Sequence, residues 1–309
     1  MAVSCGVFSL QSLNSTLIYN FKVTVFANIL GVITNTAILA VAFLIKLEDY
    51  NIIFVALIIK ELICSVICYC AMAKSIHWSE VKYREWFGII LAGIVPMLTS
   101  LLSILNYKVD VMELKWLGVE NYDSGIYSVG LSLSEYVLLM SDVFKDVLFN
   151  KTAKTDNINY VNKSLRVCST MMLIAYLCII FFGKFIIFLV YGKSYIESYG
   201  VTLIVIFGTF SMMYFKLLGT LFVAQGKWYF YFFTLLGSVA LNISCNFLLI
   251  PRIGIYGAAI TSLLSYSFAG LVFITRYCNT YKLKLRDVLV VHKEDLRDIR
   301  RLLRKKSNR

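Results

Sequence analysis

Charged residues are scarce in this chain. Only 16% of its 309 residues are Asp, Glu, Lys or Arg, whereas about a quarter of an ordinary soluble domain is charged. Hydrophobic residues make up 59%, and the mean hydropathy is +0.76. Apolar runs of about 20 residues, the length that a helix needs to cross a bilayer, recur along the chain. The composition therefore excludes a soluble globular domain and predicts an all-α, polytopic membrane protein.

Histidine is almost absent, and the cysteines form no recognisable site motif. The two histidines are His77 and His292, and the longest connector expected on the external side runs only from residue 109 to residue 123. A membrane-embedded enzyme would need a sizeable polar loop with clustered acidic, Arg or His groups. The cysteines lack metal-binding or redox spacing, and Cys64 and Cys68 lie in an apolar run, where a thiol is usually a small core residue. We therefore expect no enzymatic activity, no metal and no cofactor.

No secretory signal peptide is visible at the start of the sequence. Residues 1–15 contain neither a basic region nor a cleavage site. No Lys or Arg precedes Lys22, although a first span with a cytoplasmic N-terminus normally follows basic residues. The segment resembles an interior loop, so we expect further spans upstream of Met1.

Long apolar segments occupy most of the chain. They predict about eight transmembrane spans, at residues 18–45, 51–73, 86–108, 124–148, 168–191, 199–223, 228–250 and 255–278. The net charge of +12 arises largely from Lys and Arg gathered after the second, fourth and sixth spans and in the tail. This distribution is typical of membrane orientation rather than of nucleic-acid binding, and the positive-inside rule places both termini in the cytoplasm.

Two neighbouring spans carry polar side chains along one face. In the apolar segment from Trp86 to Asp110 these are Thr99, Ser103, Asn106 and Asp110, at helical spacings of 4, 3 and 4. In span 124–148, five polar residues fall within roughly 40° of one another on a helical wheel: Ser124, Ser128, Glu135, Asp142 and Asp146. Carboxylates on an apolar helix need water or partners. The sequence therefore predicts a hydrated cavity lined by these two spans.

Lysines and carboxylates inside the spans have competing interpretations. Glu135, near the centre of its span, either serves transport or forms a purely structural ion pair with Lys216 of span 199–223. Lys60 and Glu61 are adjacent in span 51–73, so their side chains point about 100° apart and cannot both face one groove. One of them then reaches the interface or pairs with another helix.

Charged residues near the span ends are also ambiguous. Asp142, Lys145 and Asp146 form either a solvated cytoplasmic mouth or a local pair at i,i+3 or i,i+4 spacing. Asp110, near the opposite end of the membrane, is either a gate residue or an interfacial cap. In the tail, Leu alternates with Lys and Arg over residues 281–309, which predicts a basic amphipathic helix on the anionic cytoplasmic leaflet.

The late part of the chain resembles a known transporter family. The segment from Gly226 to Tyr266 contains a Gly-Lys turn, Asn242 and Asn246, an Ile-Pro pair at 250–251, and the sequence GIYGAA from Gly254. It is similar to the late spans of Wzx-type polysaccharide flippases, which belong to the MATE/MOP superfamily with MATE drug exporters and lipid II flippases. A second segment, Tyr107 to Ser134, resembles the start of that family's C-terminal lobe.

The resemblance implies a particular domain organisation. The family has two six-helix lobes. Matched to it, residues 1–80 would be the last two helices of an N-terminal lobe, residues 81–280 a six-helix C-terminal lobe, and residues 281–309 a cytoplasmic tail. About four N-terminal spans of the two-lobe bundle would then be absent, since only about eight of the twelve are expected here.

The resemblance also implies transport without chemistry. An undecaprenyl-pyrophosphate-linked oligosaccharide would be flipped from the cytoplasmic to the periplasmic leaflet of the bacterial inner membrane. The product would feed surface polysaccharide synthesis, such as O-antigen of lipopolysaccharide, capsule or exopolysaccharide. The expected partners are this lipid-linked oligosaccharide, membrane lipids, and polysaccharide polymerase or assembly proteins, and nucleic acid is not among them.

Individual residues receive roles from this scheme. The sugar head would contact hydrogen-bonding walls and the pyrophosphate would contact lysines, with Lys108 as one available cation. The expected substrate-cavity residues are Thr99, Ser103, Asn106, Asp110, Ser128, Glu135, Lys216 and Lys60. Glu135 could exchange a coupling proton, while the two lobes rock around a site at the membrane midplane.

Three other functions stay open. A MATE-like cation or drug antiporter would need an acidic, aromatic cavity, and the lysines on at least two spans argue against it. A membrane-embedded sugar polymerase or glycosyltransferase is disfavoured by the short polar connectors. A truncated, inactive remnant of a flippase is the third.

Overall fold

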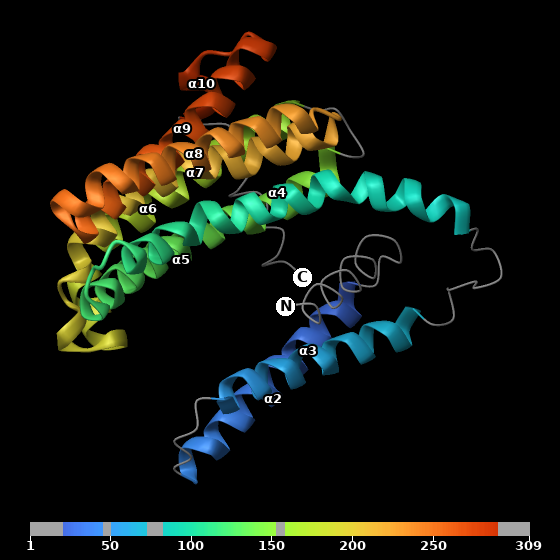
Figure 1. Cartoon of the computed structure of the whole chain (residues 1–309). Coiled ribbons are helices and arrows are strands. Elements are labelled where there is room, and N and C mark those ends of the chain that lie inside the picture. The colour runs from blue at the N-terminus through green and yellow to red at the C-terminus, as the bar shows by residue number, and fades with distance from the viewer. Residues whose placement is uncertain (1–20, 46–50, 73–82, 153–157, 290–309) are drawn as a thin grey trace, which may run out of the picture. The chain divides into compact units, whose positions relative to one another are not determined.

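The chain folds almost entirely into α-helices. The computed structural model describes residues 21–45, 51–72, 83–152 and 158–289, and this part of the chain contains no β-strand. In chain order the elements are α2 (Phe21–Leu44), α3 (Asn51–Met72), α4 (Tyr83–Trp116), α5 (Asn121–Thr152), α6 (Ile158–Tyr191), the 3₁₀ turn η3 (Lys193–Tyr195), α7 (Ser198–Ala224), α8 (Trp228–Ile253), α9 (Ile255–Tyr281) and α10 (Leu285–Leu289) (Figure 1). The predicted all-α class is confirmed.

Six helices within the described ranges are long and apolar enough to cross a membrane. They are Val25–Leu44, Asn51–Ala71, Ile158–Tyr191, Ser198–Ala224, Trp228–Ile253 and Ile255–Tyr281. The chain is therefore a multi-pass membrane protein. The two remaining predicted spans, 86–108 and 124–148, lie in α4 and α5, which are 34 and 32 residues long. Their membrane crossing, and with it the total of eight spans, stays a prediction.

The chain divides into two compact units. The N-terminal unit comprises Met1–Trp86 and the C-terminal unit comprises Phe87–Arg309. The division lies close to the boundary expected at residue 80. It falls near the start of α4, so nearly all of that helix belongs to the C-terminal unit. The assignment of the units to two family lobes stays a prediction.

In the N-terminal unit, α2 packs against α3 through small residues. Ala27, Cys64 and Cys68 form its buried apolar cluster, and the Cys64 thiol donates to the Ala27 carbonyl oxygen at 3.2 Å. A Cβ atom on Gly31 would come within 2.8 Å of Cys64 Sγ. Small side chains therefore allow this close helix contact, as is usual between membrane helices.

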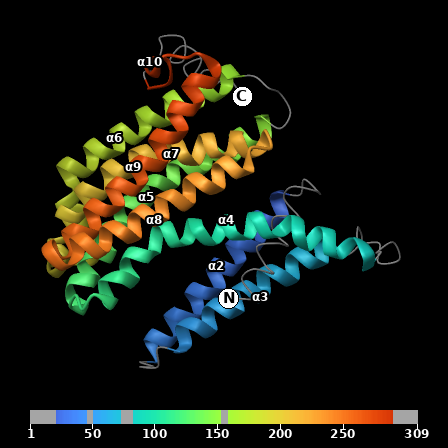
Figure 2. The same ribbon diagram turned by 45° about the horizontal axis from the view of Figure 1, so that its top comes forward.

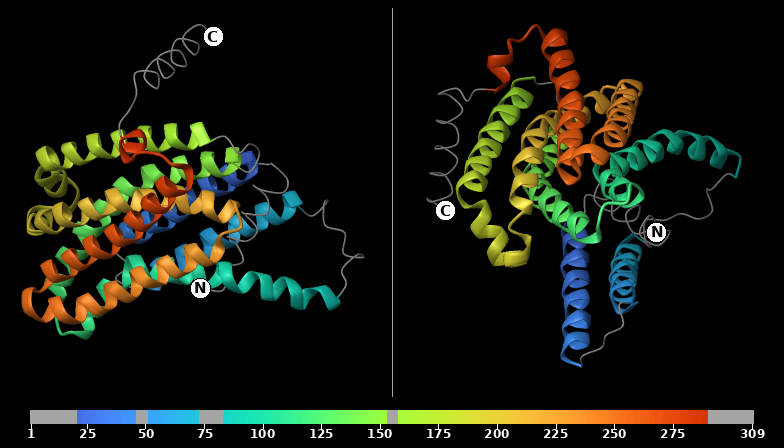
Figure 3. Two further views of the ribbon diagram at one scale, coloured as in Figure 1. Left: turned by 90° about the horizontal axis from the view of Figure 1, so that it is seen from above. Right: turned by 60° about the vertical axis from the view of Figure 1, so that its left-hand side comes forward.

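The core of the C-terminal unit is built around α7. This helix packs against α5 on one side and α9 on another, and α8 runs beside α9 (Figures 2 and 3). Aromatic rings fill the space between α7, α8 and α9, with Phe215, Phe222 and Tyr231 around Phe273. At Gly270 of α9 a side chain would collide with the α7 backbone at Ser211. This glycine therefore lets the two helices touch.

Two glycines terminate the helices at the ends of α8. Gly226, with φ +75°, lies in the turn between α7 and α8, and Gly254, with φ +58°, lies between α8 and α9. Backbone with positive φ favours glycine because it has no Cβ. Pro251 occupies the last turn of α8, just before Gly254. The sequence thus specifies both reversals of the α7–α8–α9 segment locally.

The beginning of the tail is tied to the helix bundle. The Arg166 guanidinium of α6 donates to the Asp287 carbonyl oxygen of α10 at 2.9 Å, and Val288 is fully buried. Tyr277 near the end of α9 donates to Asn162 Oδ1 at 2.6 Å. Only the start of the expected amphipathic helix can be compared, because residues 290–309 lie outside the described residues.

Candidate functional site

Polar side chains from four helices meet inside the C-terminal unit. α4 contributes Asn106, Asp110 and Glu113, whose spacings of 4 and 3 place them on one helical face. α5, α8 and α9 contribute the rest. We call this group the buried polar cluster, and its members, all at most 1% exposed, are Asn106, Asp110, Glu113, Tyr127, Ser238, Asn242, Asn246, Ser262 and Ser265.

Asp110 lies at the centre of the buried polar cluster. The Tyr127 hydroxyl donates to Asp110 Oδ2 at 2.5 Å, and the Ser262 hydroxyl donates to the same oxygen. The carboxyl group is 0% exposed, and within the described part of the chain no Lys, Arg or His forms an ion pair with it. Burial of a carboxylate without a cation is costly. A bound proton or small cation would neutralise this charge.

A second carboxylate, Glu113, belongs to the same cluster. Asn246 Nδ2 donates to Glu113 Oε2 at 2.6 Å and also lies 3.0 Å from Asn242 Oδ1. Asn242 Nδ2 in turn donates to Ser265 Oγ at 3.3 Å. Glu113 was not among the predicted site residues, although its position three residues after Asp110 puts it on the same polar face. α8 therefore contributes amide groups that join α4 to α9.

Several polar atoms in and beside the cluster have no hydrogen-bond partner among the residues that the structure describes. They are Asp110 Oδ1, Asn246 Oδ1 and Asn106 Nδ2 within the cluster, and Thr261 Oγ1 and Tyr266 Oη beside it. Most buried polar atoms in folded proteins are paired, so each exception calls for an explanation. Four of these five atoms are oxygens. Within the described ranges no three His, Cys, Asp or Glu side chains gather to hold a metal, so a cation would rely mainly on amide and hydroxyl oxygens.

Charged side chains form a second group, which we call the charged row: Lys108, Glu135, Asp142, Lys145 and Lys216. Lys108 Nζ lies 2.9 Å from Glu135 Oε2. Lys216 Nζ lies 2.9 Å from Asp142 Oδ2, and Lys145 Nζ lies 3.4 Å from Asp142 Oδ1. Among the side chains that the structure describes here, three lysines face two carboxylates, which leaves one positive charge in excess. The row therefore favours an anionic ligand.

Lys216 is the most enclosed cation of the charged row. Its side chain is 17% exposed, compared with 52% for Lys108. Its ammonium group lies 5.5 Å from the centre of the Tyr107 ring, at a distance where a cation is attracted to the aromatic face. Lys216 also lies within the candidate span of α7. A lysine at such a place is retained only where it is paired or hydrated.

The structure contradicts one ion pair that was considered from the sequence and confirms another. The direct ion pair between Glu135 and Lys216 is wrong, because each has a different partner. The local pair between Asp142 and Lys145 is confirmed, with Lys216 as an additional partner of Asp142. The Asp146 side chain lies outside the described residues. Sequence alone did not identify Lys108 as the partner of Glu135 or Asp142 as the partner of Lys216, because each pair joins two different helices.

The predicted polar stripes divide between different environments. Thr99, Asn106 and Asp110 are buried, and the Ser238 hydroxyl donates to Asn106 Oδ1 at 3.0 Å. Ser103 and Ser128 are half-buried and donate to carbonyl oxygens one turn earlier in their own helices. Much of the α4 stripe is thus occupied by protein partners, and the hydrated cavity stays a prediction.

Lys60 lies in the N-terminal unit. Its ammonium group is 3.7 Å from Glu61 Oε1, so it pairs with its sequence neighbour. The proposed joint action of Lys60 with Lys216 in one substrate cavity stays a prediction.

Comparison with known protein families, with curated proteins and with solved structures finds no match for this chain. The likeness to polysaccharide flippases therefore remains a resemblance between short sequence segments.

Proposed function

We propose that this chain acts as a membrane transporter for an anionic, lipid-linked oligosaccharide, which it moves from the cytoplasmic to the outer leaflet of a bacterial inner membrane. The charged row is the observation that carries the proposal. Its described side chains place an excess of positive charge beside membrane helices in a chain that is otherwise poor in charge. A pyrophosphate group needs such charge when it leaves water.

Ligand binding would proceed by exchange of ionic partners. In the structure, Asp142 neutralises Lys216 through two contacts, at 2.9 and 3.0 Å. A phosphate oxygen would replace the Asp142 carboxylate, so Lys216 would never face the membrane interior unpaired. Lys145 would then retain Asp142 as its partner. In this scheme the ion pair between Asp142 and Lys216 neutralises the lysine only until the ligand binds.

Coupling of transport to an ion gradient is assigned to the buried polar cluster. Glu135 is neutralised by Lys108, whereas the side chains that contact Asp110 in the described part of the chain donate through hydroxyl groups. We therefore propose Asp110, in place of Glu135, as the group that takes up a proton or a monovalent cation. Lys108 and Asp110 lie two residues apart on α4. A movement of α4 on ion binding would consequently reach the charged row, in keeping with an alternating-access scheme.

A cation or drug antiporter is the second candidate. It is favoured by the two buried carboxylates, Asp110 and Glu113, together with the neighbouring rings of Tyr127 and Tyr266. Such a protein would use the buried polar cluster for its cargo and would have no use for Lys216. The two functions therefore make different predictions for one side chain.

The experiment is complementation of surface polysaccharide in a flippase-null strain, with membrane protein level measured in parallel. We expect Lys216→Met to abolish export at a normal protein level, and Lys216→Arg to retain part of it because a cation remains. The matched control is Lys184→Met in α6, since Lys184 lies over an aromatic ring, at 5.4 Å from the Tyr199 centroid, but is outside the charged row. It should export normally.

The double variant Asp142→Asn with Lys216→Met separates transport from structure. A purely structural pair predicts that single neutralisations lower the protein level and that the double change restores both level and export. The transport role predicts a normal level without export. Full export by the double variant would refute the proposal. Cation-driven drug efflux that survives Lys216→Met would favour the antiporter.

A further inference from the structure

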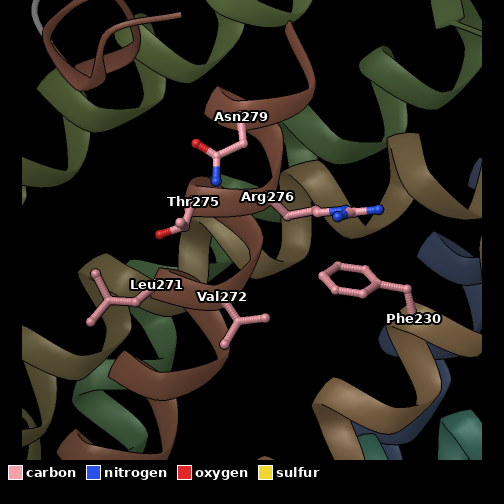
Figure 4. A pocket seen from close by; sticks show the side chains of 6 residues that line it. All are labelled: Phe230, Leu271, Val272, Thr275, Arg276 and Asn279. Carbon is pink, nitrogen blue, oxygen red and sulfur yellow. The ribbon is translucent and has the colours of Figure 1, made fainter. Parts of the chain in front are cut away.

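An open groove lies on the surface of the C-terminal unit between the beginning of α8 and the end of α9. Its volume is about 400 Å³. Figure 4 shows the side chains that line it, and all but one come from α9: Phe230, Leu271, Val272, Thr275, Arg276 and Asn279. None of these residues belongs to the charged row or to the buried polar cluster.

The lining of the groove changes from apolar to polar along α9. Leu271 and Val272 form the apolar end, and Thr275, Arg276 and Asn279 follow within the next two turns of α9 (Figure 4). Leu271 is 58% exposed although it belongs to a candidate membrane span. An exposed leucine at this place would contact the acyl chains of lipids, so the groove opens toward the membrane.

With the end of α9 taken as the membrane surface, the polar end of the groove lies at the depth of lipid headgroups. Arg276 precedes the end of α9, Tyr281, by five residues, which corresponds to about 7.5 Å along a helix. The headgroup layer is roughly 5–8 Å thick on each side of a bilayer. Leu271 lies about 15 Å from the same helix end, which is the depth of hydrocarbon. The groove therefore follows the polarity of one phospholipid molecule.

The guanidinium group of Arg276 is positioned to bind an anion. Its guanidinium group lies over the Phe230 ring, 5.9 Å from the ring centre, and Figure 4 shows it extending across the groove toward that ring. Within the described ranges no carboxylate forms an ion pair with Arg276. A guanidinium group can bind phosphate through two parallel hydrogen bonds. Lys227, just before α8, adds a second cation at this end of the hairpin.

We propose that this groove binds an anionic phospholipid of the leaflet that adjoins the end of α9. The lipid phosphate contacts Arg276 and Asn279, and one acyl chain lies along Phe230, Leu271 and Val272. A soluble phosphate ion would use only the polar end and would leave the apolar end unfilled. The proposal does not depend on the identity of the transported substrate.

The test is native mass spectrometry of the purified chain, titrated separately with phosphatidylglycerol, phosphatidylcholine and inorganic phosphate. We expect at least one phosphatidylglycerol molecule to bind more tightly than phosphatidylcholine. Arg276→Gln should weaken that molecule roughly tenfold or more, as expected for loss of a hydrogen bond to a charged group, and Arg276→Lys should weaken it less. Val272→Trp, which fills the apolar end, should also weaken it.

The matched control is Arg252→Gln, because Arg252 is an exposed arginine in the last turn of α8, at the opposite end of the hairpin. It should leave the tightest phosphatidylglycerol unchanged. Equal weakening by the control would reduce the effect to general electrostatic attraction and overturn the site. Equal binding of phosphatidylcholine, or displacement of the lipid by inorganic phosphate, would overturn it as well. Unfolding temperatures measured in phosphatidylcholine verify that each variant is folded.

Discussion

Removal of the Asp110 side chain tests the buried polar cluster most directly. Asp110→Ala deprives the hydroxyl groups of Tyr127 and Ser262 of their shared acceptor, and both are buried in the C-terminal unit. The two hydroxyl groups also lie 3.0 Å apart and can pair with each other, so one buried donor is left without a partner. The variant should therefore lose about 1–3 kcal/mol. Asp110→Asn keeps one acceptor oxygen and removes the charge, so it should lose less.

The measurement is thermal unfolding of the purified variants in one detergent. A loss of this size corresponds to a decrease of roughly 2–12 °C in unfolding temperature for a domain of about 200 residues. Asp123→Ala is the matched control, because Asp123 is a half-buried carboxylate in the first turn of α5. Its favourable interaction with the helix N-terminus is worth at most about 1 kcal/mol.

Two outcomes would refute the reasoning. If Asp110→Ala unfolds at the same temperature as the wild type, the carboxyl group does not serve as the acceptor for both hydroxyls. If Asp110→Asn unfolds at a lower temperature than Asp110→Ala, the number of hydrogen-bond acceptors at position 110 does not determine the stability of the cluster. Asp110→Asn should also abolish ion-coupled transport at a normal protein level. The amide side chain of asparagine carries no negative charge, so it cannot take up a coupling proton or balance the charge of a cation.

Three further predictions follow from the C-terminal unit. Asn246→Ala leaves the buried Glu113 carboxylate without its amide donor and should lower stability by about 1–3 kcal/mol, whereas Asn246→Gln should lose less; equal losses would contradict the hydrogen bond. Gly270→Val places a branched side chain against the α7 backbone and should abolish membrane accumulation, which immunoblotting measures; a normal level would contradict the close helix contact. In intact cells of a cysteine-free background, an impermeant thiol reagent should label cysteine at Asn121 and spare cysteine at Gln225; the reverse would contradict a cytoplasmic C-terminus.

Sequence pattern determined the architecture because its causes are local. Apolar length alone specifies a membrane helix, and six such helices are present in the described ranges. Gly226, Pro251 and Gly254 determine the two turns around α8 through their own backbone preferences. The polar face of α4 was equally visible, because helical periodicity places Asn106 and Asp110 on one side whatever the helix packs against.

Partners were decided only by the tertiary structure. The sequence located Glu135 and Lys216 within their helices. Helix packing decides that Glu135 forms an ion pair with Lys108 and that Lys216 forms one with Asp142. Asp110 meets Ser262, which is 152 positions away in the chain. Periodicity specifies the direction in which a side chain points from its own axis, and it contains no information on which helix lies there. The polar residues were therefore predictable, and their division into a buried polar cluster and a charged row was not.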